Sequence, residues 1–253
     1  MLSTWHLHMT IPNGFITQAD TLYHDDQNRL VKITDHYTDD APDDDWQRHF
    51  IFTYHGTDSL PYLMNAPSAF SSYNKQTVCD YLLYYDNLGR IIKDSTSEGT
   101  VTAFSYPENS IIIDSHVPLI PQENDPENYF HDSLSFHSGN LLAYYQNMLQ
   151  PALPTGIPFP VQTTIFTYSS FSNPLYNRGI PRGLAVFLNT FFWRSTLPDF
   201  VSERLISTST LVSINPPLTY SWKTDSAGRV SGGSAEVPGY PNLSKYDYEF
   251  TYQ

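Results

Sequence analysis

Apolar and polar residues alternate along most of this chain, and short polar turns interrupt the alternation. Alternation with a period of two is typical of β-strands that bury one face. It is clearest in four segments that each end on a tyrosine, namely 48–54, 100–106, 163–168 and 245–252. We predict strands here, with Phe50, Phe52 and Tyr54 sharing one face of the first.

Four further segments combine an apolar or aromatic start, a short polar turn and a second apolar stretch. They are residues 22–33, 83–94, 134–145 and 221–232. A supersecondary unit that recurs in this way indicates a repetitive architecture. Consecutive units are most simply laid side by side as an antiparallel meander.

The turns of these units share a chemical pattern. Asp86 to Arg90 reads Asp-Asn-Leu-Gly-Arg, and residues 225–229 repeat the Asp, Gly and Arg positions. Residues 25–29 place Asn28 where the glycine stands, and both residue types tolerate positive φ. Such loops form hairpins with a bulge. The turn at 137–140 is one residue shorter and lacks the arginine.

One segment departs from the strand pattern. Residues 181–194 are apolar on most sides and follow Pro181, a residue tolerated in the first helical turn. We predict a short helix near 181–194, packed against the sheet. The fold class is therefore mainly β: a curved antiparallel meander or half-barrel with one short apolar helix. Residues 1–253 form one β-rich domain, and 1–19 are expected to be a loosely ordered N-terminal segment.

Composition narrows the possible functions. The net charge of −13, with 13 basic residues scattered along the chain, disfavours a nucleic-acid partner. No apolar run approaches the twenty or so residues of a transmembrane helix, so we expect no transmembrane segment. The single cysteine, Cys79, lies in a strand-like stretch and is expected to be a small buried hydrophobe. No nucleotide, metal-hydrolase or nucleophile motif is present, and no cofactor is expected.

The turn around Asp86-Asn-Leu-Gly-Arg90 resembles the YD repeats of Rhs-type surface proteins. The order of Gly-Arg hairpins, Asn173-Pro-Leu-Tyr176, an apolar helix and a last hairpin at 225–229 resembles an uncharacterised family of predicted lipoproteins from Gram-negative gut anaerobes. That resemblance implies a curved antiparallel sheet and export to the periplasm or cell surface. It implies no catalytic residues, and we expect this sequence to lack the leader of such proteins.

Two groups of residues are candidate sites. Five aspartates within seven residues, Asp39, Asp40, Asp43, Asp44 and Asp45, supply the oxygen ligands that calcium takes, although they do not follow the EF-hand spacing. A solvated acidic loop is the alternative. His6 and His8 would share a strand face, but a metal would need a third ligand.

Trp46, Trp193 and Trp222 could form stacking platforms for a sugar or an apolar ligand. The alternative is that they fill cross-strand pairs of the sheet.

Three functions follow, in order of preference. The first is an exported, non-enzymatic binding or structural module that recognises a glycan or another cell-envelope component. The second is a periplasmic carrier that encloses an apolar ligand between the sheet and the helix. The third is a hydrolase, which would require two carboxylates with perturbed pKa values in one cleft.

Overall fold

The computed structural model describes most of the chain, and the paragraphs below concern only these parts. They are residues 2–11, 14–39, 46–67, 78–97, 99–117, 128–146, 148–149, 162–174, 176, 186, 201–211, 217–239 and 245–252.

Seventeen β-strands make up the described secondary structure. They are β1 (Leu2–Ile11), β2 (Gly14–His24), β3 (Leu30–Asp39), β4 (Trp46–Thr53), β5 (Leu63–Pro67), β6 (Val78–Tyr85), β7 (Ile91–Thr96), β8 (Val101–Ser105), β9 (Ser110–Val117), β10 (Asn128–His137), β11 (Asn140–Gln146), β12 (Met148–Leu149), β13 (Gln162–Ser172), β14 (Arg204–Leu211), β15 (Leu218–Thr224), β16 (Val230–Glu236) and β17 (Lys245–Tyr252).

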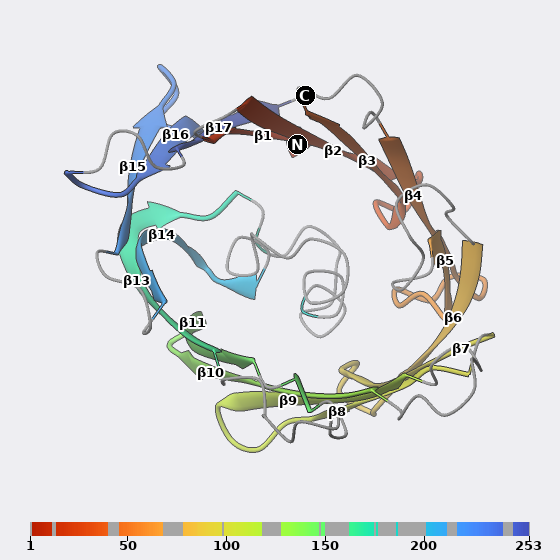
Figure 1. The fold of residues 1–253 in the computed structure, drawn as a ribbon. Helices are drawn as coiled ribbons and strands as arrows, with labels where there is room; N and C mark the ends of the chain where they lie inside the picture. Colours follow the sequence, from red (N-terminus) through yellow and green to blue (C-terminus); the bar gives the residue numbers. More distant parts are fainter. Residues whose placement is uncertain are drawn as a thin grey trace.

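All strand pairs are antiparallel, and they follow the order of the sequence. Each strand from β1 to β10 pairs with the next, β11 pairs with β13, and each strand from β13 to β16 again pairs with the next, while the short β12 pairs with β10. β17 also pairs with β1, from Leu2 opposite Tyr252 to Thr10 opposite Lys245. The series of pairs therefore returns to its first strand, and Figure 1 shows the strands as a ring with the two chain ends side by side.

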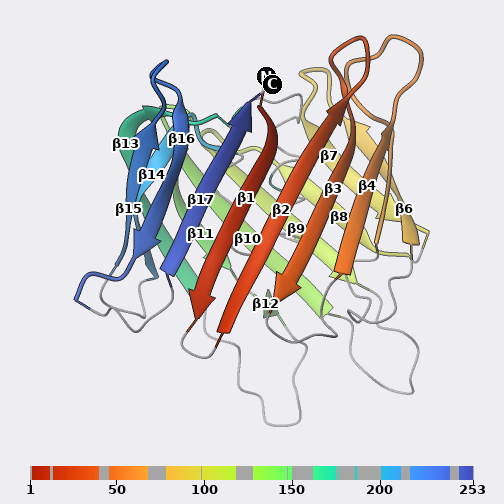
Figure 2. The same ribbon diagram turned by 90° about the horizontal axis from the view of Figure 1, so that it is seen from above.

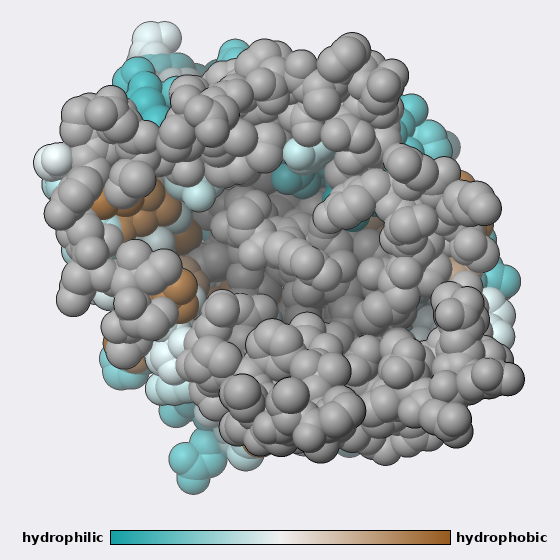
Figure 3. All heavy atoms as spheres, in the orientation of Figure 1, coloured by the Kyte–Doolittle hydropathy of each residue, from teal (hydrophilic) through white to brown (hydrophobic). Residues whose placement is uncertain are grey.

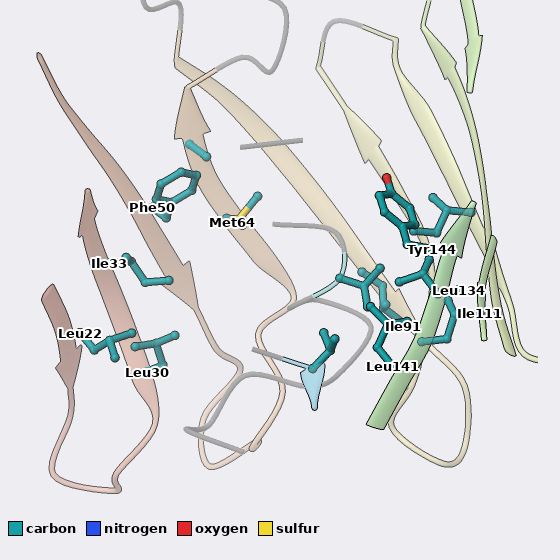
Figure 4. Close-up of a cluster of buried hydrophobic side chains, with 14 of the residues drawn as sticks. Leu22, Leu30, Ile33, Phe50, Met64, Ile91, Ile111, Leu134, Leu141 and Tyr144 are labelled. Atoms are coloured by element: carbon teal, nitrogen blue, oxygen red, sulfur yellow. The ribbon is translucent and has the colours of Figure 1, made fainter. Parts of the chain in front are cut away.

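The wall of the ring has an apolar inner face and a more polar outer face. Along β6, for example, Cys79, Tyr81 and Leu83 are buried and alternate with exposed residues. Leu22, Ile33 and Phe50 from one side and Ile91, Leu134 and Leu141 from the other point into the space between the walls (Figure 4). The strands are tilted in the side view of Figure 2, and hydrophilic residues colour much of the described outer rim in Figure 3. The core is thus on the inside of the ring.

Three hairpins are fastened by the same set of contacts, which we call the Asp–Arg–Tyr unit. In the second one, Asp86 Oδ1 accepts the N–H groups of Leu88 and Arg90, both at 2.9 Å, and Oδ2 accepts Nε of Arg90. The Arg90 guanidinium lies 4.5 Å from the centre of the Tyr106 ring, and the Tyr106 hydroxyl donates to the Ile91 carbonyl at 2.6 Å. The other two units are Asp25, Arg29 and Tyr54 with the Leu30 carbonyl, and Asp225, Arg229 and Tyr252 with the Val230 carbonyl.

The hairpin at 137–140 is held differently. Its tyrosine contact is kept, since the Tyr168 hydroxyl donates to the Leu141 carbonyl. In place of an arginine, the segment 201–204 lies on the turn: the Leu141 N–H donates to Ser202 Oγ at 3.0 Å, and the Arg204 N–H donates to Asn140 Oδ1 at 2.8 Å. The segment 201–204, distant in sequence, therefore takes the place of the arginine side chain that this turn lacks.

The antiparallel meander predicted from the sequence is confirmed. A half-barrel would leave its first and last strands unpaired at one edge. In this structure the first strand, β1, pairs with the last strand, β17. Within the segment 1–19, residues 2–11 form β1 and residues 14–19 begin β2, and β1 pairs with a strand on both sides.

The helix predicted near 181–194 lies outside the described residues except for Val186, which is fully buried. Within the described ranges, no helix is long and apolar enough to cross a membrane.

Candidate functional site

A hollow of about 340 Å³ lies on the outer face of the wall, over strands β15, β16, β17 and β1. One row of directly opposed residues crosses it: Lys223 on β15, Gly232 on β16, Glu249 on β17 and His6 on β1. Ser231 and Asp247 also line it. Since neighbouring strands are about 4.8 Å apart, this row spans roughly 14 Å.

The hollow exists because the row has no side chain at its second position. Gly232 leaves a gap between the exposed side chains of Lys223 and Glu249. The glycine is also required structurally, since a Cβ here would lie 2.6 Å from the Tyr248 carbonyl oxygen. A larger residue would both crowd the backbone and fill the hollow.

The side chains around the hollow offer both hydrogen-bond donors and acceptors. Lys223 donates, the carboxylates of Glu249 and Asp247 accept, and His6 and Ser231 can do either. Asp247 is partly neutralised by Lys245, with Nζ 3.2 Å from Oδ1. Such a mixture suits a ligand with several hydroxyl groups, each of which both donates and accepts.

Two carboxyl groups meet on the inner face of the wall. Asp20 on β2 stands directly opposite Asp35 on β3, and Asp35 stands opposite Arg48 on β4. The exposed fractions of the two aspartates are only 2% and 0%. Arg48 donates from Nε and Nη2 to Oδ2 of Asp35. We call these three residues the inner acid cluster.

The two carboxyls of this cluster are electrostatically unequal. Burial, reinforced by the charge of Asp35, raises the pKa of Asp20 well above its ordinary value. Burial also raises the pKa of Asp35, but the Arg48 guanidinium opposes that rise. Neither oxygen of Asp20, nor Oδ1 of Asp35, accepts a hydrogen bond from the described residues.

A separate carboxyl, Asp94, is buried on β7. Burial raises its pKa to about 7, and the hydroxyl of Thr102 on β8 partly offsets the rise. Thr102 in turn shares a 3.1 Å hydrogen bond with Ser115 on β9. Farther along the wall, the Tyr144 hydroxyl donates to Asp132 at 2.7 Å. These polar residues lie within an otherwise apolar inner face.

Of the three tryptophans predicted to bind a ligand, the structure describes the side chain of one. The Trp222 ring is half-buried against Tyr220, Tyr248 and Phe250, and its Nε1 donates to the Ile206 carbonyl at 2.6 Å. It also lies over Gly233, where a Cβ would approach the ring to 2.5 Å. These contacts fit the cross-strand packing alternative. Trp46 begins β4 but its side chain is outside the described residues, as is the whole of Trp193.

The predicted calcium ligands cannot be located. Asp39 ends β3, with its side chain outside the described residues, and Asp40, Asp43, Asp44 and Asp45 lie outside them entirely. The ranges that are described contain no group of three or more His, Cys, Asp or Glu residues able to hold a metal ion. The calcium site remains a prediction. Cys79 is buried, as expected.

Comparison with known proteins identifies similar folds only. No family model matches the chain, and no curated protein resembles it in sequence. A porin-like protein from Bacteroides uniformis ATCC 8492 aligns with 100% of this chain and 96% of its own, at a TM-score of 0.52 and 14% identity. A porin-like protein from Bacteroides vulgatus ATCC 8482 aligns with 96% of this chain and 99% of its own, at a TM-score of 0.54 and 12% identity. At such identities the likeness establishes the fold alone.

Proposed function

We propose that this protein is an exported, non-enzymatic binding module of the cell envelope, and that its outer hollow recognises a glycan. The observation that carries this proposal is the row formed by Lys223, Gly232, Glu249 and His6. It presents hydrogen-bonding groups of both charges around a gap on an accessible face. In small-molecule sites, a small number of precisely placed polar groups fix the orientation of the ligand and provide specificity.

The packing of the inner face favours a protein that binds its ligand on the outer surface over a carrier that encloses a ligand in its interior. The largest fully buried side chains, among them Phe50, Met64, Ile91 and Leu134, all belong to the apolar interior. Side chains this completely covered are in contact with other protein atoms, as in a packed core. The described inner wall therefore favours a filled interior over a cavity that awaits an apolar ligand.

A hydrolase receives weaker support. The inner acid cluster does place two carboxyls with raised pKa values side by side. However, Asp20 is only 2% exposed and Asp35 is fully buried. A substrate could reach them only if the wall moved, so their contribution is better sought in the structure of the wall itself.

Envelope localisation rests on two lines of support. The Asp–Arg–Tyr units are the turns through which the sequence resembles YD-repeat surface proteins, and the structural neighbours are porin-like proteins of Bacteroides. Fractionation of cells that express the full-length gene, with an antibody against the native protein, tests the localisation directly.

The binding proposal is tested on an array of defined oligosaccharides, including peptidoglycan fragments, followed by calorimetric titration of any sugar that binds. Lys223→Ala and Glu249→Gln should each weaken the affinity at least tenfold. Lys93→Ala and Glu236→Gln remove the same charges elsewhere on exposed positions and should leave the affinity unchanged. Equal binding by the two hollow variants and wild type would overturn the assignment of the site.

A further inference from the structure

The charge count of the inner acid cluster does not balance if every group is ionised. Two carboxylates and one guanidinium leave a net charge of −1 in a layer where Asp35 is fully buried and Asp20 nearly so. An uncompensated charge in such a setting is strongly unfavourable, and the group usually neutralises instead. One additional positive charge, or one bound proton, would restore neutrality.

The hydrogen bonds of the cluster show where that charge belongs. Asp35 Oδ2 is already engaged by Arg48, so Asp35 is the carboxyl that is stabilised in its ionised form. The oxygens left without a donor are Oδ1 of Asp35 and both oxygens of Asp20. They belong to residues directly opposite one another across β2 and β3, where Cβ atoms are about 5 Å apart and carboxyl groups can touch.

We propose that Asp20 and Asp35 form a buried proton-binding site, in which one proton resides on Asp20 and is donated to Oδ1 of Asp35. A single proton neutralises the cluster with Arg48 and gives a partner to two of the three unpaired oxygens. A metal ion fits less well, because the described residues provide only these two carboxylates and the adjacent guanidinium repels a cation.

The groups that face the pair all agree with this arrangement. β4 contributes Arg48, and β1 places Trp5, which has no titratable group, opposite Asp20. β2 contributes Gln18, whose uncharged amide helps to lower the pKa of Asp35, whereas His36 on β3 lies on the opposite, exposed face of its strand. The charge of Arg48 lowers the pKa of both carboxyls, but Arg48 is hydrogen-bonded to Asp35, and this bond favours a proton on Asp20 over one on Asp35.

The site lies beside the place where the ring closes. β2 pairs with β3 on one side and with β1 on the other, and β1 pairs with β17. Loss of the proton at alkaline pH would put two adjacent negative charges into this wall. The β1–β3 region should then open locally more often, whereas the far wall at β8–β10 should not respond.

The direct experiment is nuclear magnetic resonance of the wild-type protein, with the side-chain carboxyl carbon of Asp20 followed through a titration from pH 4 to pH 9. A carboxyl that is still protonated at pH 7 supports the proposal. A carboxyl that titrates below pH 5 overturns it. This measurement does not depend on the folding of any variant.

Hydrogen exchange of Asp20→Asn provides the second test, in an Asp94→Asn background that removes the titration of the buried Asp94. An asparagine amide can donate to Asp35 at every pH. In the protein that keeps Asp20, the protection of the β1–β3 amides should fall about tenfold or more between pH 7 and pH 9, because each unit by which the pKa of Asp20 is raised in the folded state corresponds to a tenfold change in the opening equilibrium. In the Asp20→Asn protein, the protection of the same amides should stay constant. An equal fall in both proteins would count against the proposal. The β8–β10 amides serve as the internal control.

Discussion

The guanidinium of Arg229 lies 4.7 Å from the centre of the Tyr252 ring, and thereby joins the turn between β15 and β16 to the last residue of β17. The Tyr252 hydroxyl donates to the Val230 carbonyl at 2.7 Å, one residue beyond the arginine. A turn is thus fastened to a strand that follows it later in the chain. The same relationship recurs between Arg29 and Tyr54 and between Arg90 and Tyr106.

Removing the tyrosine hydroxyls should cost similar amounts in the three units. We expect Tyr54→Phe, Tyr106→Phe and Tyr252→Phe each to lower the free energy of unfolding by about 1 kcal/mol, because each leaves a partly buried carbonyl without its donor. Urea unfolding measures this. Tyr84→Phe, at an exposed position, should change little. A loss confined to one of the three units would show that they are not energetically equivalent.

The turn glycines provide a second test. Gly89 and Gly228 have φ values of +73° and +76°, a conformation that costs an L-residue roughly 1–2 kcal/mol. Gly228→Ala should show this backbone cost alone, since no atom lies within 4 Å of the new Cβ. Gly89→Ala should cost somewhat more, because its Cβ would lie 3.3 Å from Leu60 Cδ1. Thermal unfolding of the two variants gives the comparison, and Asn28→Gly, which relieves a non-glycine residue at φ 62°, should not destabilise.

Asp94 should make the whole protein more stable in mild acid. Its pKa of about 7 in the folded state exceeds its ordinary value of 3.8, so folding retains a proton that the unfolded chain releases. Its contribution is intact below pH 4 and is lost as the pH rises to 7, by up to about 4 kcal/mol at roughly 1.4 kcal/mol per pKa unit.

Asp94→Asn removes that titration. The variant should match wild type near pH 4 and exceed it in unfolding free energy at pH 8. Urea unfolding at both pH values tests the difference, with the exposed Asp26→Asn as the matched control. A constant difference between wild type and Asp94→Asn across this range would contradict the assignment of the titration to Asp94.

Ser202 should stabilise the hairpin at 137–140, which lacks the turn arginine of the three Asp–Arg–Tyr units. Its hydroxyl accepts the Leu141 N–H and lies 2.9 Å from the Tyr168 hydroxyl, in a fully buried position. Ser202→Ala should lower the unfolding free energy by about 1–3 kcal/mol, the cost of an unsatisfied buried donor. Ser207→Ala, whose hydroxyl bonds an exposed Thr167, should cost less. Hydrogen exchange of the Leu141 amide gives the local readout.

The strands and turns were predictable because their signals are local. Alternation locates the buried faces, and Asp, Gly and Arg at fixed spacing define the three fastened turns. The tyrosine at the end of each predicted strand was also visible, but its bond to the preceding turn was not, since that contact depends on how the strands pair. The pairing of β1 with β17 was beyond reach for the same reason.

The sequence also contains a signal for the inner acid cluster that the prediction of sites did not use. Asp20 alternates in phase with Leu22, and Asp35 with Ile33, so both fall on the buried face of their strands. A carboxylate in the apolar phase of a strand is unusual. That observation alone would have marked both residues, whereas their contact with Arg48 requires the register of three strands. The outer hollow depends on a row across four strands and could not be found from any one of them.

The pairing of β1 with β17 also constrains the order of events during folding. The hairpins can form as the chain emerges, since their contacts are local, but β1 must keep one edge unpaired until the last strand has been synthesised. During that interval its free N–H and C=O groups could accept a strand from another chain. Completion of the ring is therefore a late, long-range step, and we expect it to be the slowest in folding.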